Sequence, residues 1–166
     1  MVTTAPLDIP VIEPSSRVQG FLQSQRQILI NGKWQDASSG KTFAVYNPAN
    51  GQEITQVAEG DTEDINRAVA AARKVFDDPN HAWNTMTPSE RGKLIWKIGD
   101  LILENLDELA ELESLDNGKP MGVAKVADVP LSADLFHYMA GWVTKIEGNT
   151  IPVSYTHLTL PTKRIV

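Results

Sequence analysis

The ten residues Glu-Leu-Glu-Ser-Leu-Asp-Asn-Gly-Lys-Pro, from Glu111 to Pro120, end a long amphipathic helix. Asn117-Gly118 followed by Pro120 is a helix stop signal, because glycine readily adopts the left-handed conformation that ends a helix and proline cannot continue one. Leucine and isoleucine recur at three- and four-residue spacing back to Leu94, and Thr87 to Glu90 supplies an N-cap, a first-turn proline and a capping-box glutamate. The pattern predicts one uninterrupted helix over 88–117.

Two more helices are predicted on either side of this one. Asp61 can cap a helix whose apolar face runs from Ile65 to Phe76, and Asp77-Asp78-Pro79-Asn80 ends it. A third helix is predicted over 123–146, with Pro130 marking a fresh first turn or a kink because proline does not fit inside a helix.

Residues 27–57 have the pattern of short strands. Ile28 to Ile30 is followed by Asn31-Gly32, and Asn-Gly between two strand-like runs is a strong hairpin signal. Two further strands, 43–46 and 53–57, flank the turn at 47–51. We therefore expect a small antiparallel β meander followed by three helices.

Composition excludes several classes of function. The chain has 166 residues, 42% of them hydrophobic, which suits one globular domain. With 15 basic and 21 acidic residues its net charge is -6, so we expect neither nucleic acid nor an anionic membrane as a partner. No segment has the pattern of a secretory signal or a membrane span, and we expect a cytoplasmic protein. The absence of cysteine excludes disulfides, thiolate metal sites and thiol catalysis.

Six segments, in order and at matching spacing, resemble the N-terminal third of NAD(P)-dependent aldehyde dehydrogenases. These segments are Leu29-Ile30-Asn31-Gly32-Lys33-Trp34, Val45-Tyr46-Asn47-Pro48, Gln56-Val57-Ala58-Glu59-Gly60, Leu115-Asp116-Asn117-Gly118-Lys119-Pro120, Tyr138-Met139-Ala140-Gly141-Trp142 and Gly148-Asn149-Thr150-Ile151-Pro152-Val153. The resemblance implies an α/β fold, in which residues 27–146 form the N-terminal part of a Rossmann-like cofactor domain and 147–153 begin an oligomerisation strand. Residues 1–26 are then a flexible N-terminal arm, and residues 154–166 look like a foreign tail.

The resemblance also implies an activity. Family members oxidise an aldehyde to a carboxylic acid with NAD or NADP, using a nucleophilic cysteine, a glutamate that activates water and an asparagine at the oxyanion, and they assemble as homo-dimers or homo-tetramers. The segments that would match these residues and the nucleotide-binding loop fall after Val153. We therefore assign no catalytic or cofactor-binding residue, and expect the chain alone to be inactive. Trp83-Asn84 lacks the family's surrounding motif and is no substitute for the catalytic asparagine.

Residue by residue, the resemblance implies two sites. In many family members a monovalent cation lies between backbone carbonyls and an aspartate, at positions that match Val45, Tyr46 and Asp116. Acidic residues crowd this helix end, where the dipole disfavours negative charge, which also suggests a cation. The alternative is an Asx turn made by Asp116 around Gly118, with Lys119 as the compensating charge.

The second implied site is substrate access. Ala127 and Leu131 match positions that line the mouth of the family's aldehyde tunnel. The alternative, which the residue pattern alone favours, is that both are ordinary packing residues on an apolar helix face.

Other patterns indicate structural roles. His81, His137 and His157 are far apart in the chain and lack companions at metal-ligand spacing. A different class of function, a non-catalytic helical interaction module, stays open as an alternative. The resemblance implies that the apolar stripe of the predicted 88–117 helix covers a parallel sheet whose strands come mostly from later in the chain, so we expect an unstable or aggregation-prone product.

Overall fold

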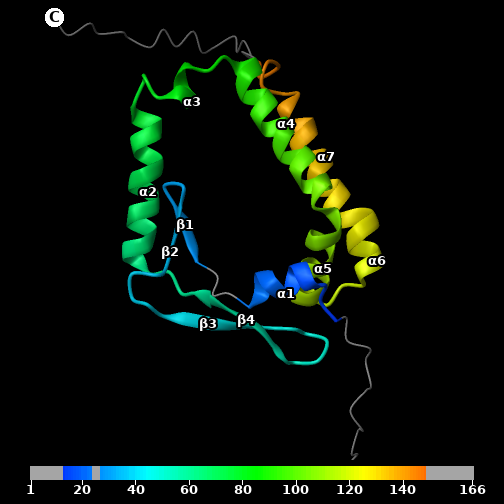
Figure 1. Ribbon diagram of the computed structural model, residues 1–166. Coiled ribbons are helices and arrows are strands. Elements are labelled where there is room, and N and C mark those ends of the chain that lie inside the picture. Colours follow the sequence, from blue (N-terminus) through cyan, green and yellow to red (C-terminus); the bar gives the residue numbers. More distant parts are fainter. Residues whose placement is uncertain (1–12, 24–26, 149–166) are drawn as a thin grey trace, which may run out of the picture.

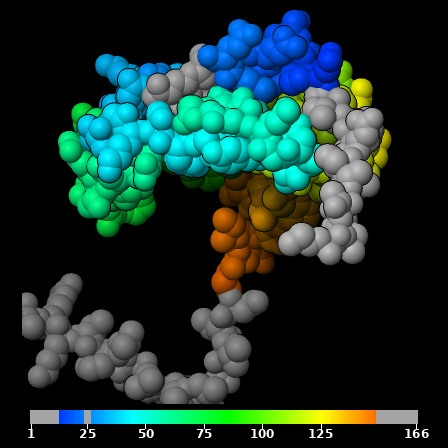
Figure 2. All heavy atoms as spheres, turned by 90° about the horizontal axis from the view of Figure 1, so that it is seen from below, coloured from blue at the N-terminus to red at the C-terminus, as the bar shows by residue number. Residues whose placement is uncertain are grey.

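The computed structural model describes residues 13–23 and 27–148, which form an open frame (Figure 1). Helix α2 makes one side, α4 with α7 makes the other, and strands β3 and β4 run along the base beside α1, as the view from below also shows (Figure 2). The elements, in order, are α1 (Ser16–Leu22), β1 (Ile28–Ile30), β2 (Lys33–Gln35), β3 (Thr42–Tyr46), β4 (Glu53–Ala58), α2 (Thr62–Asp77), α3 (Ala82–Thr85), α4 (Pro88–Glu104), α5 (Leu106–Asn117), α6 (Met121–Val123), the π-helical segment η1 (Ala124–Asp128) and α7 (Val129–Ala140).

Both predicted hairpins form, but they do not join into one meander. Asn31 and Gly32 both have positive φ, as the tight turn between β1 and β2 requires, and Leu29 lies opposite Trp34. Strands β3 and β4 form a second, separate two-stranded antiparallel sheet among the described residues. The expected meander is wrong because the loop between β2 and β3 does not make a hairpin turn; Ser38 in this loop is instead hydrogen-bonded to α2.

The predicted N-cap at Asp61 and the predicted capping box at Thr87 are confirmed, and Asp61 forms a capping box of its own with Asp64. The Asp61 carboxylate accepts from the N–H groups of Glu63 and Asp64 at the start of α2, and the Asp64 carboxylate accepts from the N–H of Asp61. Thr87 and Glu90 make the equivalent reciprocal pair at the start of α4. These contacts satisfy first-turn N–H groups that have no partner inside the helix.

The uninterrupted helix expected over 88–117 is wrong, because it breaks at Asn105. This residue has φ -112° and ψ 23°, and it separates α4 from α5. Its side-chain amide donates to the Leu101 carbonyl at 2.8 Å, while its oxygen accepts from Arg17 at 2.7 Å. An asparagine side chain competes in this way with the helix's own hydrogen bonds. The predicted stop is confirmed, since Gly118 has φ 76° and ends α5.

The third predicted helix is segmented rather than continuous. Its π-helical part, η1, lies immediately before α7, and Pro130 occupies the first turn of α7, as the sequence indicated. Because proline has no N–H and its ring displaces the preceding turn, a wider π turn accommodates it. The helix also ends at Ala140 instead of Ile146, where the N–H of Gly141 donates to the carbonyls of His137 and Tyr138.

The expectation of a loosely held arm is wrong for residues 16–22, which form α1. Val18 is fully buried, and the Ser15 backbone N–H donates to the buried carboxylate of Glu111 on α5. Arg17 forms an ion pair with Glu108 at 2.6 Å. A helix of seven residues is too short to show periodicity, and its stability comes from these contacts with α5. Residues 1–12 lie outside the described part of the chain.

The closest helix packing lies between α4 and α7. Gly92 and Gly99 are buried on α4, where a Cβ at Gly99 would lie 2.5 Å from the His137 ring and 2.9 Å from the Ala133 carbonyl oxygen. His137 stacks on Trp96 with ring centroids 4.2 Å apart and lies 3.1 Å from an Asp100 carboxylate oxygen. A small apolar cluster of Ala110, Ala124 and Val129, with Ile102 and Leu106 against it, continues this core.

Candidate functional site

A cavity with a volume of about 340 Å³ lies between α1, β3–β4 and α5. Val45 from β3 and Asp116 from the last turn of α5 both line it, although 71 residues separate them in the chain. Tyr46 follows Val45 on β3 with an exposed side chain. The other lining residues are Phe21, Leu22, Ile54, Thr55, Val57, Leu109, Leu112, Glu113 and Leu115. The cavity is therefore apolar except for Thr55 and two carboxylates at its α5 side.

The β3–β4 ladder is irregular at the predicted cation ligands. Val45 pairs with Thr55 and Tyr46 with Glu53, so the register shifts between Val45 and Tyr46. A β-bulge disrupts regular hydrogen bonding and leaves a residue unpaired. The residue left without a partner by this shift is Ile54 on β4, so the irregularity lies opposite Val45 and Tyr46, next to a cavity that also holds a carboxylate.

The Asx-turn alternative for Asp116 is wrong in the described structure. The turn around Gly118 is made by the neighbouring residue Asn117, whose side-chain oxygen accepts from the Lys119 N–H at 2.8 Å. The Lys119 ammonium pairs with Asp128 at 2.6 Å, a hydrogen bond that raises the pKa of Lys119. No hydrogen bond or ion pair joins the Asp116 carboxylate to another residue within 13–23 and 27–148. Its carboxylate can therefore serve as a ligand at the cavity.

The two predicted access residues lie one helical turn apart. Ala127 is half-buried in η1, and Leu131 is 64% exposed on α7. Residues four apart on a helix share one face. The packing alternative does not describe Leu131 in this structure, because most of its side chain contacts no other described residue.

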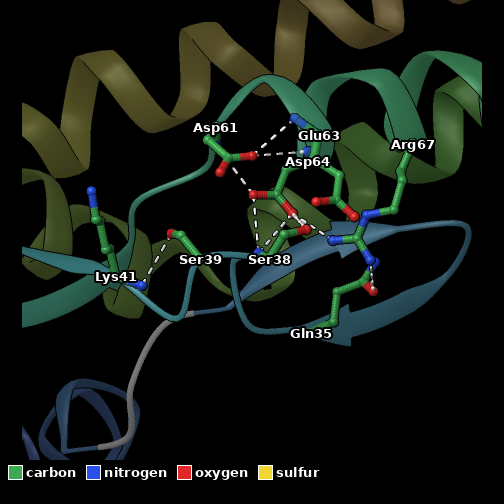
Figure 3. A network of polar contacts seen from close by, with 8 residues as sticks. All are labelled: Gln35, Ser38, Ser39, Lys41, Asp61, Glu63, Asp64 and Arg67. Carbon is green, nitrogen blue, oxygen red and sulfur yellow. Dashed lines mark hydrogen bonds and ion pairs between the residues drawn. The ribbon is translucent and has the colours of Figure 1, made fainter.

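A buried polar network at the start of α2 was missed from the sequence (Figure 3). The Asp64 side chain is about 2% exposed and accepts from the backbone N–H and hydroxyl of Ser38, from Arg67 and from the Asp61 N–H. The Asp61 N–H is the largest cause that holds the pKa of Asp64 far below its ordinary value, opposed by burial and assisted by Ser38 and Arg67. Gln35 accepts from the same arginine.

This network has a structural role. A carboxylate that stays ionised and whose oxygens are occupied by donors cannot exchange protons with a substrate near neutral pH. The hydrogen-bond network joins α2 to the loop after β2. The signal available in the sequence was Asp61 as an N-cap, which predicted the start of the helix but neither the contact between Asp61 and Asp64 nor the long-range partner Ser38.

His81 and the Trp83-Asn84 pair have local structural contacts. The His81 ring accepts from the Trp83 N–H at 3.1 Å and caps the short helix α3. The Asn84 side-chain amide donates to the carbonyls of Val75 at 2.6 Å and Asp78 at 2.7 Å, so it terminates α2. His157 and the predicted strand 147–153 lie largely or wholly outside the described residues. None of the helices within the described ranges has the length and apolarity needed to span a bilayer.

Comparison with known proteins gives one consistent result. The model of the aldehyde dehydrogenase family matches residues 34–164. Aldehyde dehydrogenase family 2 member B4 of Arabidopsis thaliana is 47% identical over 142 residues, which cover 86% of this chain and 25% of that protein. Human aldehyde dehydrogenase 1A1 is 42% identical over 146 residues, covering 88% of this chain and 28% of that protein.

The fold has matches among solved structures too. The NAD+ complex of an aldehyde dehydrogenase from Bacillus cereus aligns with a TM-score of 0.79 and 46% identity, over 87% of this chain and 29% of that one. The chain thus spans between a quarter and a third of the length of these relatives. The family match also extends into residues 154–164, so the foreign origin of the 154–166 tail stays an untested prediction, as do the other domain limits.

Proposed function

The chain belongs to the aldehyde dehydrogenase family, and we propose that it is the N-terminal part of an enzyme that oxidises an aldehyde to a carboxylic acid with NAD or NADP. The observation that supports this most is the match to the Bacillus cereus NAD+ complex, at 46% identity over 87% of the chain. We place the proposed enzyme in the cytoplasm and expect it to act as a homo-dimer or homo-tetramer.

In this proposal the chain contributes structural elements of the enzyme and no catalytic residue. It contains no cysteine, so it cannot provide a thiolate nucleophile. The carboxylate most shielded from water, Asp64, is held ionised in a filled network and cannot act as a general acid or base. NAD or NADP would accept the hydride in the complete enzyme, and the residues that hold the cofactor lie outside this chain. We expect the chain alone to leave aldehyde unoxidised.

The cavity between β3 and α5 is the proposed site of a monovalent cation. Backbone carbonyls of Val45 and Tyr46 and the Asp116 carboxylate are hard oxygen donors, the type that sodium and potassium prefer. The position of Val45 and Asp116 on one cavity and the unpaired state of the Asp116 carboxylate among the described residues support the fit. Such an ion would offset the negative charge of Asp116 and Glu113 at the C-terminal end of α5.

Ala127 and Leu131 are the proposed access residues for the aldehyde. The exposed Leu131 side chain supports this role, because it leaves an apolar surface available to a substrate or to other parts of a complete enzyme. The alternative function, a non-catalytic helical interaction module, is favoured by the same exposed apolar surfaces. A measurement of aldehyde oxidation in a complete enzyme distinguishes the proposed function from this alternative.

A chimera tests the proposal. The stretch of the Bacillus cereus enzyme that matches this chain is replaced by residues 27–148, and NADH formation is followed with an aliphatic aldehyde. We expect sustained NADH formation that is abolished by alkylation of the chimera's cysteine, while the 166-residue chain alone gives none. Aldehyde-dependent NADH formation by the chain alone, or a folded chimera that binds NAD+ and stays inactive, would overturn the proposal.

A further inference from the structure

Three asparagines in the chain are followed directly by glycine: Asn31, Asn50 and Asn117. In such a pair the backbone nitrogen of the glycine can attack the side-chain carbonyl carbon of the asparagine, because glycine has no Cβ to hinder the approach. By residue type all three pairs are therefore open to the same reaction. They differ in whether the asparagine amide and the attacking nitrogen are held in hydrogen bonds.

Asn117 is held at both reacting groups. Its amide nitrogen donates to the Glu113 carboxylate, and its side-chain oxygen accepts from the Lys119 N–H at 2.8 Å. The N–H of Gly118, which would attack, donates to the Ser114 carbonyl at 3.1 Å. The amide and the nitrogen can therefore meet only after several hydrogen bonds at the end of α5 have broken.

Asn50 is held in a similar way in the turn between β3 and β4. Its side-chain oxygen accepts from the Gln52 N–H at 2.9 Å, and its amide nitrogen donates to the Gln52 side-chain oxygen at 3.3 Å. The Gly51 N–H donates to the carbonyl of the buried residue Asn47 at 2.7 Å. This pair, too, reacts only if its turn opens.

Asn31 lacks these restraints in the part of the chain that the structure describes. Asn31 and Gly32 are both exposed in the turn between β1 and β2. Among residues 13–23 and 27–148, neither the Asn31 side chain nor the Gly32 N–H has a hydrogen-bond partner. The two strands are three residues long and pair only with each other within those ranges, and such a hairpin is marginally stable by itself. The turn can therefore open for the attack.

We propose that Asn31 is a site of spontaneous deamidation, whereas Asn50 and Asn117 are protected from it. The Gly32 nitrogen gives its proton to a solvent base and bonds to the side-chain carbonyl carbon of Asn31. The bond from that carbon to Nδ2 breaks, and Nδ2 takes a proton from solvent and leaves as ammonia. One water molecule then opens the resulting succinimide ring, giving aspartate when the side-chain carbonyl is released and isoaspartate when the main-chain carbonyl is released. This inference goes beyond the proposed function and does not depend on it.

The two products have different consequences for the hairpin. Both add one negative charge, but isoaspartate also adds a methylene group to the backbone of the turn. A two-residue turn sets the register of the strands that it joins, so the longer backbone disturbs the pairing of Ile30 with Lys33. Gln35 on β2 accepts from Arg67 on α2 at 3.2 Å. Isoaspartate at residue 31 should therefore weaken the hairpin and its contact with α2.

Ageing of the chimera that carries residues 27–148 tests the inference, and the chimera need not be active. The folded chimera and the same protein in concentrated urea are kept at mildly alkaline pH, and the loss of each asparagine is followed by mass spectrometry of peptides. The protection of a site is its rate in urea divided by its rate in the folded protein. We expect the protection of Asn50 and Asn117 to exceed that of Asn31 by roughly 10-fold or more, which corresponds to about 1.4 kcal/mol and thus to one or two hydrogen bonds.

Water enriched in heavy oxygen identifies the reaction, because opening of the ring takes its oxygen from solvent. Both products at residue 31 should carry the label. Equal protection at the three sites in a chimera whose circular dichroism shows its helices, stronger protection at Asn31, or products without the label would each overturn the inference.

Two variants complete the experiment. Asn31→Gln should abolish the mass change in the peptide that contains residue 31, and should leave the rates at Asn50 and Asn117 within about 2-fold of those in the unchanged chimera. Asn31→Asp has the added charge without the added methylene group, so it should be more stable in urea than aged protein enriched in isoaspartate. Equal stability of these two samples would contradict the expected effect on the hairpin.

Discussion

Replacing Gly99 by alanine places a methyl group at the closest helix contact in the molecule. The added Cβ would lie 2.5 Å from both Cδ2 and Nε2 of His137 and 2.9 Å from the carbonyl oxygen of Ala133. Carbon atoms in contact normally lie about 3.5–4.0 Å from their neighbours. The His137 ring could rotate only by leaving its stack on Trp96 and its contact with Asp100, and the Ala133 oxygen belongs to the backbone of α7.

The expected net loss of stability follows from two opposing effects. Overpacking of a closely packed contact costs roughly 1–3 kcal/mol. Alanine in place of glycine inside a helix contributes roughly 0.5–1 kcal/mol in the opposite direction. Because one of the clashing atoms is a backbone oxygen that cannot turn aside, we place the overpacking cost at the upper end, and Gly99→Ala should lower the free energy of unfolding by about 2 kcal/mol.

Urea unfolding of the chimera that carries residues 27–148, followed by far-ultraviolet circular dichroism and by tryptophan fluorescence, measures this change. The matched control is Gly122→Ala, whose Cβ would have no neighbour within 4 Å and whose φ is not positive, so its stability should be unchanged or slightly higher. Adding His137→Ala to Gly99→Ala removes one clashing group and should recover part of the loss. If Gly99→Ala is as stable as the unchanged chain, the packing of α4 against α7 is not as described.

The other predictions concern charge, cation binding and substrate access. Hydrogen bonds, above all from the Asp61 N–H, depress the pKa of Asp64 against the opposing effect of burial, so its contribution to stability is present in full above the ordinary carboxyl value of 3.8 and is lost as pH falls below it; acid unfolding of Asp64→Asn should be less steep between about pH 5 and pH 2. Sodium or potassium should raise the melting temperature of the chimera, and Asp116→Asn should abolish this rise; an unchanged salt response in that variant would refute the cation site. Leu131→Trp in the chimera should raise KM for bulky aldehydes more than for acetaldehyde, and equal KM ratios would contradict the access role. Residues 27–148 alone should not melt sharply as a monomer, because Phe76 and other large apolar side chains are exposed; a cooperative melt with a monomeric sedimentation profile would count against this.

Local signals predicted the starts of α2 and α4 and the end of α5. Each of these signals involves residues within four positions of one another: the caps at Asp61 and Thr87 and the left-handed Gly118. Such short-range interactions can be predicted from neighbouring residues in the sequence. The turn at Asn31-Gly32 is similar, because its positive φ angles are a property of those two residue types.

Contacts between distant segments were not readable in this way. The break at Asn105 coincides with its contact to Arg17, 88 residues earlier, and the helix at 16–22 is held against α5 by Val18 and by Glu111. The sequence predicted only the N-cap at Asp61, whereas the hydrogen bonds of Asp64 to Ser38 arise only when the loop after β2 folds against α2. Each of these contacts depends on chain closure over many residues, which no local pattern specifies.

For the candidate site, too, some features were predicted from the sequence and others required the tertiary structure. The sequence by itself determined the family, the absence of a thiol nucleophile and the residue types at 45, 46 and 116, because these are properties of the residues and their order. Only the tertiary structure decided that Val45 and Asp116 line one cavity, that Asn117 rather than Asp116 makes the turn, and that Leu131 is exposed. The physical reason is that a hydrogen bond or a cavity wall requires atoms within a few ångströms, and for segments far apart in the chain that proximity is set by packing.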